Sequence, residues 1–105
     1  EVTFELNVED VAYMKEAVSY AKMGLVPAGA YRNRQHSGKM VDTSRVAEHY
    51  IDLLYDPQTS GGLLISVAPE YVEDIMNEFK EKEMETKVSV IGKVIEKSDK
   101  WIRLY

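Results

Sequence analysis

The apolar residues of this chain repeat with two different periods, and this switch limits the possible folds more than any other feature. Val2, Phe4 and Leu6 alternate with polar residues, which predicts a short, half-buried strand. A stripe spaced by three and four then predicts a helix of about four turns, with Asn7 as N-cap and Gly24 near its C-terminus. The stripe consists of Val11, Met14, Val18, Ala21 and Leu25. A chain with both periods is expected to pack helices on a sheet.

Two further helices follow from the same spacing. One is expected over residues 44–54, capped by Thr43 or Ser44 and ending before Asp56-Pro57, because the residue before a proline avoids the helical conformation. The other begins at Pro69, which suits the first turn of a helix. Its apolar face consists of Val72, Ile75, Met76 and Phe79.

Three more strands complete the expected order. Residues 63–67 are almost continuously apolar, which predicts a central strand with both faces covered. Residues 87–96 are expected to form a strand with a bulge at Gly92, and residues 101–105 a last strand antiparallel to it. The predicted order β-α-α-β-α-β-β describes one α+β domain over residues 1–105, with a mixed or antiparallel sheet packed with helices.

Composition excludes several classes of function. The net charge is −5, from 18 acidic and 13 basic residues, so a chain-wide basic surface for nucleic acid is not expected. The chain has no cysteine, which excludes disulfides, thiolate metal sites and cysteine nucleophiles within it and fits a cytoplasmic protein. No apolar run approaches the roughly 18 residues of a membrane span. The first residue is Glu1 and not methionine, as expected for a processed or excised piece.

Thr59, Ser60, Gly61 and Gly62 form the first candidate site. Glycines let backbone N–H groups approach an anion closely, and the two hydroxyls add donors, so this loop could bind phosphate. The segment lacks the lysine and the following helix of a P-loop. A tight turn into the next strand, with the hydroxyls bonded to backbone groups, remains the alternative.

Residues 26–42 are expected to form a long loop, which holds the second candidate site. It begins with breaker residues at 26–30 and continues as a polar segment. From Tyr31 to Arg45 the net formal charge is +3. Arginine offers a planar fork that suits phosphate or carboxylate, and a solvated, mobile basic loop is the alternative. The candidate residues are Arg32, Asn33, Arg34, His36 and Lys39.

Other polar residues give weaker signals. Asp56 could be a metal ligand or a general base, but a lone carboxylate before a proline is more typical of an Asx turn. His36 and His49 are too few for a histidine-rich metal site, and His49 is expected at the boundary of the core.

The two loops carry a family resemblance. The run Asp56-Pro57-Gln58-Thr59-Ser60-Gly61-Gly62-Leu63-Leu64 resembles the C-terminal signature of selenophosphate synthetase, also called selenide, water dikinase. Residues 24–34 resemble the second landmark of that family, and residues 88–94 resemble its closing strand. Ala28 and Ala30 depart from the pattern, because many members carry a glycine and a hydroxyl residue there. The family resembles aminoimidazole ribonucleotide synthetase in architecture.

The resemblance implies that this chain is most of a C-terminal α/β domain. In that family an N-terminal domain dimerises and holds ATP, and the reactive Cys or selenocysteine and the Mg²⁺-binding aspartates precede the segment present here. ATP and Mg²⁺ would therefore belong to the full-length enzyme, and no catalytic residue or metal ligand is expected in this chain. The implied reaction turns ATP, selenide and water into selenophosphate, AMP and phosphate. The residues implied on the phosphate side of the cleft are Arg32, Asn33, Thr59, Ser60, Gly61 and Gly62.

Three readings of the function remain open. The first is a fragment of selenophosphate synthetase that is inactive alone. Its expected partners are its own N-terminal domain and a second copy in a homodimer, and it is expected to bind neither nucleic acid nor membrane. The second is a relative in hydrogenase maturation or a thiamine-phosphate kinase, against which the intact run at residues 56–62 argues. The third is a stand-alone ligand-sensing or protein-binding module without catalysis. A sensor is expected to bind phosphate or ATP alone, whereas an enzyme fragment is not.

Overall fold

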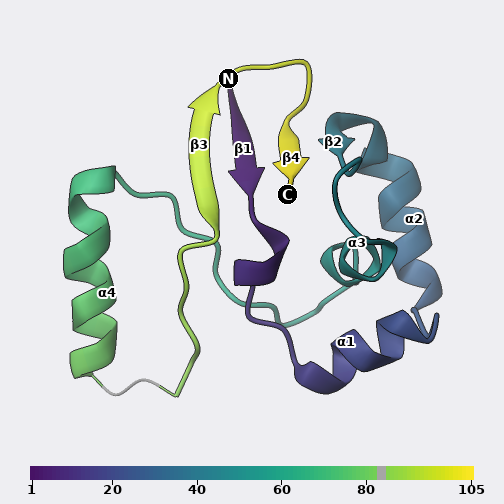
Figure 1. Cartoon of the computed structure of the whole chain (residues 1–105), viewed down its shortest axis with the longest axis horizontal. Coiled ribbons are helices and arrows are strands. Elements are labelled where there is room, and N and C mark those ends of the chain that lie inside the picture. Colours follow the sequence, from purple (N-terminus) through teal and green to yellow (C-terminus); the bar gives the residue numbers. More distant parts are fainter. Residues whose placement is uncertain (83–84) are drawn as a thin grey trace.

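A mixed sheet of four short strands lies at the centre of the molecule (Figure 1). The computed structural model describes residues 1–82 and 85–105. The strands are β1 (Val2–Leu6), β2 (Val41–Asp42), β3 (Gly92–Glu96) and β4 (Ile102–Leu104), in the order β2-β4-β1-β3. β1 is antiparallel to β3 and parallel to β4, and β4 is parallel to β2. β3 therefore forms one edge of the sheet.

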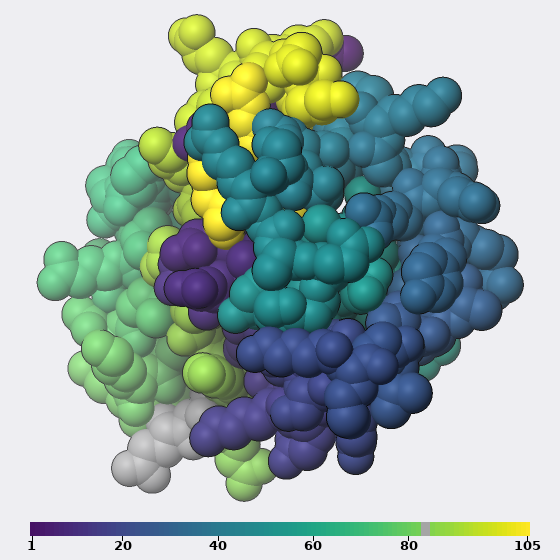
Figure 2. All heavy atoms as spheres, turned by 45° about the vertical axis from the view of Figure 1, so that its right-hand side comes forward, coloured from purple at the N-terminus to yellow at the C-terminus, as the bar shows by residue number. Residues whose placement is uncertain are grey.

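Three of the four helices in the described residues gather on one side of the sheet (Figure 1). They are α1 (Lys15–Lys22), α2 (Ala28–Ser37) and α3 (Glu48–Leu54), and α3 packs against both of the others. α4 (Val72–Glu81) lies on the far side, beyond β3. Short 3₁₀ turns cover Val8–Asp10, Gly38–Met40 and Pro69–Tyr71. In Figure 2 the three grouped helices form a continuous surface next to β4.

The core joins the sheet to this group of three helices. Its buried apolar residues come from the 3₁₀ turn after β1, from β4 and from each of the three helices: Val8, Leu104, Ala21, Ala30 and Ile51. Thr3 is fully buried, and its hydroxyl donates to the Lys100 carbonyl at 2.6 Å and accepts from the Ser98 N–H at 2.8 Å. These bonds hold the β3–β4 connection against β1.

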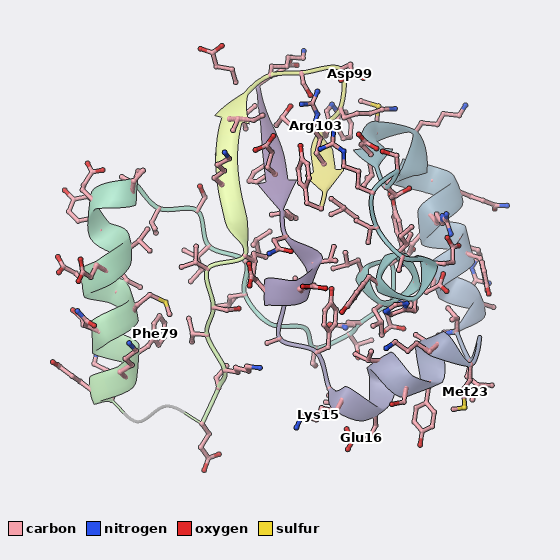
Figure 3. All side chains as sticks on the ribbon, viewed as in Figure 1. Lys15, Glu16, Met23, Phe79, Asp99 and Arg103 are labelled. Atoms are coloured by element: carbon pink, nitrogen blue, oxygen red, sulfur yellow. The ribbon has the colours of Figure 1, made fainter. Side chains whose placement is uncertain are left out.

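α4 and the segment before it lie outside this core. The apolar face of α4 is only half-buried, and Figure 3 shows Phe79 on the side that faces the rest of the chain. Leu63, Leu64 and Ile65 are 92%, 66% and 60% exposed. The radius of gyration is 14.9 Å, against about 13 Å for a closed domain of this length. The described chain is therefore looser than a self-contained domain.

Several sequence expectations are confirmed. The fold is α+β with a mixed sheet, as predicted. β1 has the predicted bounds, and the helix after Pro69 forms at Val72–Glu81. Asn7 caps the chain after β1, since its side chain accepts from the Glu9 N–H, and Gly24 has the positive φ of +77° that suits a residue just past a helix.

The helix predicted over four turns is wrong in length. The chain forms a single 3₁₀ turn at Val8–Asp10 and then α1, with extended backbone at Val11 and Met14 between them. Tyr13 lies in this break with its ring 5.6 Å from the ring of Tyr50. Tertiary packing of Tyr13 therefore overrides the helical period.

The long loop predicted over residues 26–42 is also wrong. Most of it is α2, followed by a 3₁₀ turn and β2. Pro27 precedes the first helical residue, where its missing N–H removes no helical bond, and Ala30 is buried. α3 begins at Glu48 and receives no side-chain cap from Thr43 or Ser44.

The C-terminal strands differ from the prediction in pairing. Residues 63–67 form no strand, and residues 87–91 precede β3 without joining it. Gly92 pairs with Leu6 in regular register, so the predicted bulge is wrong. β4 lies between β2 and β1 and is parallel to both. It therefore runs antiparallel to β3, as predicted, but β1 separates the two strands. In the described part of the chain, no helix is long and apolar enough to cross a membrane.

Candidate functional site

The two segments singled out in the sequence meet in space. A Cβ placed on Gly29 of α2 would lie 2.5 Å from Cγ of Pro57. One helical turn further, the Asn33 side-chain amide donates to the Tyr55 carbonyl oxygen at 2.9 Å. Residues four apart lie on the same face of a helix. One face of α2 therefore holds the segment where α3 ends and the loop of residues 56–62 begins.

Further contacts fix α2 on α3. Arg34 of α2 forms an ion pair with Glu48 in the first turn of α3, and this hydrogen-bonded partner raises the pKa of the Arg34 guanidinium. A Cβ on Gly38 would lie 3.9 Å from the Tyr55 hydroxyl, so this residue also lies over the end of α3. The two helices thus form a support for the loop of residues 56–62.

The loop itself is open to solvent. Thr59, Ser60, Gly61 and Gly62 are all exposed, and a Cβ on Gly61 would lie 3.0 Å from the Gln58 side-chain oxygen. A Cβ on Gly62 would meet nothing within 4 Å. The hydroxyls and backbone N–H groups of this loop are accessible donors, which suit an anion that approaches from outside the chain.

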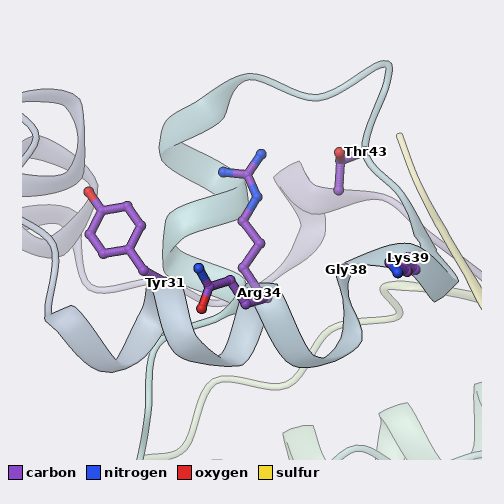
Figure 4. Close-up of a pocket in the computed structure, with 6 residues that line it drawn as sticks. Tyr31, Arg34, Gly38, Lys39 and Thr43 are labelled. Atoms are coloured by element: carbon purple, nitrogen blue, oxygen red, sulfur yellow. The ribbon is translucent and has the colours of Figure 1, made fainter.

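A shallow hollow of about 500 Å³ lies along the other face of α2 (Figure 4). It is lined by Tyr31, Arg34, Gln35, Gly38, Lys39 and Thr43. The Arg34 guanidinium is paired with Glu48, which leaves the Lys39 ammonium as the positive charge for a ligand in this hollow. The hollow therefore offers less to an anion than the basic sequence suggested.

Two carboxylates lie at a second, more apolar hollow of about 200 Å³ between α1 and α3. Burial, and then the neighbouring Glu48, raise the pKa of Asp52, and Asp56 is on the same lining. Within residues 1–82 and 85–105, no group of three His, Asp or Glu side chains could hold a metal ion. The metal-ligand hypothesis for Asp56 therefore gains no support here.

The profile of "AIR synthase related protein, C-terminal domain" matches residues 1–103. The chain belongs to this family of C-terminal domains. Proteins named selenide, water dikinase are among its curated relatives. That of Pelobacter propionicus is 47% identical over 83% of the chain, and that of Clostridioides difficile is 40% identical over 97%. "Selenide, water dikinase 2" of Peptoclostridium acidaminophilum is 41% identical over 96%.

The chain spans less than a third of the length of these relatives: 25% for Pelobacter propionicus and 29% for each of the other two. The chain thus matches only a part of each of these relatives. The two motifs noted in the sequence, at residues 24–34 and 56–64, are in contact where α2 packs against the end of α3.

The predicted site residues of this AIR synthase related domain fall into two groups. Asn33 is placed at the base of the loop, and Thr59, Ser60, Gly61 and Gly62 lie on the loop itself. Arg32 is exposed on α2, and in the described residues no ion pair or hydrogen bond connects it to residues 59–62. The binding roles of these six residues stay predictions.

Sequence reasoning missed Gly29, Tyr55 and Glu48. The spacing of Gly29 and Asn33 was the available signal, but it has meaning only once residues 28–37 are known to be helical. His49 is half-buried with its ring 4.3 Å from the ring of Tyr50, in agreement with its expected place at the core boundary.

Proposed function

We propose that this chain is the C-terminal domain of a cytoplasmic, ATP-dependent selenide, water dikinase and helps to close its phosphate-binding cleft. The observation that carries the proposal is the contact of the two motif segments, at Gly29 with Pro57 and at Asn33 with Tyr55. The relatives with this name and the matching family of C-terminal domains support it.

The chemistry of the exposed loop suits this role. Phosphoryl transfer depends mainly on positioning and neutralising anionic oxygens. Thr59 and Ser60 offer hydroxyls, Gly61 and Gly62 offer unhindered backbone N–H groups, and Arg32 offers a guanidinium at the surface of α2. In the proposed reaction ATP, selenide and water give selenophosphate, AMP and phosphate, and these groups would face phosphate oxygens of the nucleotide.

The described residues of this chain do not provide a binding site for the Mg²⁺ ions that accompany ATP. The described residues contain no group of three carboxylate or imidazole side chains in metal-binding geometry. We therefore assign metal binding and the reacting nucleophile to the remaining part of the enzyme.

The partner of this domain is, in our proposal, the N-terminal domain of the same polypeptide. Exposed apolar residues at 63–67 are a surface that a folded protein normally covers. The relatives are more than three times as long as the matched segment, so additional polypeptide exists in them to provide that cover.

The test is the Gly61→Val variant of the full-length enzyme. A branched side chain 3.0 Å from Gln58 and beside the loop N–H groups should lower turnover by roughly tenfold or more. The melting temperature should change little because the site is exposed. Ala68→Val, which introduces the same branched side chain seven residues further along, is the matched control. Wild-type turnover in Gly61→Val would refute the role of the loop.

A binding measurement on the isolated chain separates the enzyme domain from a sensor. We expect no calorimetric heat with ATP or inorganic phosphate, because the rest of the cleft is on other polypeptide. Micromolar binding of either ligand by residues 1–105 alone would favour the stand-alone ligand-sensing module.

A further inference from the structure

We propose that Gly29 and Asn33 act together as a latch that sets the position of the loop of residues 56–62. In this inference Asn33 is a positioning residue and not a phosphate ligand. The latch itself is a property of the fold, and only its effect on turnover rests on the proposed function.

The Asn33 side chain bonds to the point where α3 ends. Tyr55 is the C-cap of α3, and the last carbonyl groups of a helix lack partners within it. The Asn33 amide donates to the Tyr55 carbonyl at 2.9 Å, which supplies one of these partners. This donor is therefore engaged within the chain itself.

Gly29 is the second half of the latch. A Cβ at this position would lie 2.5 Å from Cγ and 3.2 Å from Cβ of Pro57, closer than two carbon atoms can pack. The proline ring is rigid, so it cannot move aside as the end of a long side chain could. α2 cannot retreat easily either, because Ala30 beside Gly29 is only 2% exposed.

The loop has few other ties to the protein. In the described residues, no backbone hydrogen bond starts or ends within residues 57–67. The last one before them runs from the Asp56 N–H to the Leu53 carbonyl, and the next one after them from the Tyr71 N–H to the Ala68 carbonyl. No side-chain hydrogen bond reaches residues 57–67 within the described part. The position of the loop is thus set at its base, by the contacts that α2 makes with Tyr55 and Pro57.

Hydrogen exchange on the nucleotide-free, full-length protein tests the latch directly. The readout is a peptide over residues 53–58, because the Tyr55 and Asp56 amides bond to Ile51 and Leu53 at 3.1 and 3.3 Å. Asn33→Asp keeps the shape of the side chain but removes the donor, and we expect exchange roughly three- to tenfold faster. Gln35→Ala, on the other face of α2, is the control and should leave this exchange unchanged.

A double variant guards against simple misfolding. Gly29→Ala should accelerate the same exchange, and adding Pro57→Ala should restore it, because the second change removes the ring that the new Cβ meets. Unchanged exchange in both Asn33→Asp and Gly29→Ala would overturn the latch. So would a Gly29→Ala defect that Pro57→Ala does not relieve.

Turnover of Asn33→Asp then separates this inference from the proposed function. Faster exchange with lowered turnover supports both. Faster exchange with normal turnover keeps the latch and removes the role of the loop in the reaction. Normal exchange with lowered turnover and a raised KM for ATP identifies Asn33 as a direct nucleotide contact, and overturns the latch.

Discussion

The backbone of Gly92 passes so close to Glu5 that a Cβ on Gly92 would overlap the Glu5 carbonyl oxygen. Gly92 begins β3 and pairs with Leu6, so the contact lies at the start of the β1–β3 ladder. Glycine is required here by close approach of two strands and not by a bulge.

Replacement of Gly92 by alanine should therefore destabilise the fold by about 1–3 kcal/mol, because either the strands separate or the backbone distorts. The free energy of unfolding in urea measures this. Gly62→Ala is the matched control, since its Cβ would meet nothing within 4 Å and its φ is not positive. Equal stability of the two variants would contradict the close approach.

Thr3 links β1 to the β3–β4 connection through its hydroxyl. Thr3→Val keeps the shape but leaves the Ser98 N–H and the Lys100 carbonyl without this partner, at a cost of about 1–3 kcal/mol. Thr59→Val, at an exposed position, should change the unfolding free energy far less. A Thr3→Val protein as stable as wild type would show that the buried hydroxyl network is dispensable.

The sequence predicted correctly those elements in which the spacing of apolar residues matches the face that the element buries. The alternation at residues 2–6 gave β1, and the apolar spacing from Val72 to Phe79 gave α4. α2 could not be found in this way, because only Ala30 of its residues is buried and polar side chains surround the rest. This helix is held by contacts to α3 and Pro57, which are distant in sequence.

The prediction of a strand at residues 63–67 was wrong although its apolar signal is strong. Its residues favour a strand, but a strand needs a partner to bond with, and the described residues supply none. The two motif segments that define the candidate site do meet in the fold, whereas the roles of their residues stay predictions. The motif at residues 56–62 and Asn33 are adjacent, although the bond from Asn33 to Tyr55 depends on a helix that the sequence did not reveal.

Tyr13 should make the protein sensitive to alkali. Burial, and then Tyr50, raise the pKa of Tyr13 to about 12 from an ordinary value of 10.0. The folded state thus favours the neutral phenol, and this stabilisation is complete below pH 10 and is lost as the pH rises through 12. We expect the unfolding free energy to fall by on the order of 1 kcal/mol over this range because of Tyr13.

Tyr13→Phe should remove this alkaline loss. Its stability near pH 7 should equal or exceed that of wild type, because the Tyr13 hydroxyl is buried without a hydrogen-bond partner in the described residues. Tyr71→Phe, at an exposed ring, is the control. An identical pH profile for wild type and Tyr13→Phe would exclude Tyr13 as the titrating group.

The isolated chain of 105 residues should self-associate as a two-fold dimer. Residues 63–67 are exposed and carry no charge, so an antiparallel pairing of two copies centred on Ile65 would set Leu63 against Val67 without like-charge repulsion. Ile65→Lys should abolish the dimer in sedimentation velocity, because it places two ammonium groups together at the two-fold axis. Asn77→Lys adds the same charge on the exposed face of α4 and should leave the dimer intact. A strictly monomeric wild-type chain at high concentration would contradict this pairing.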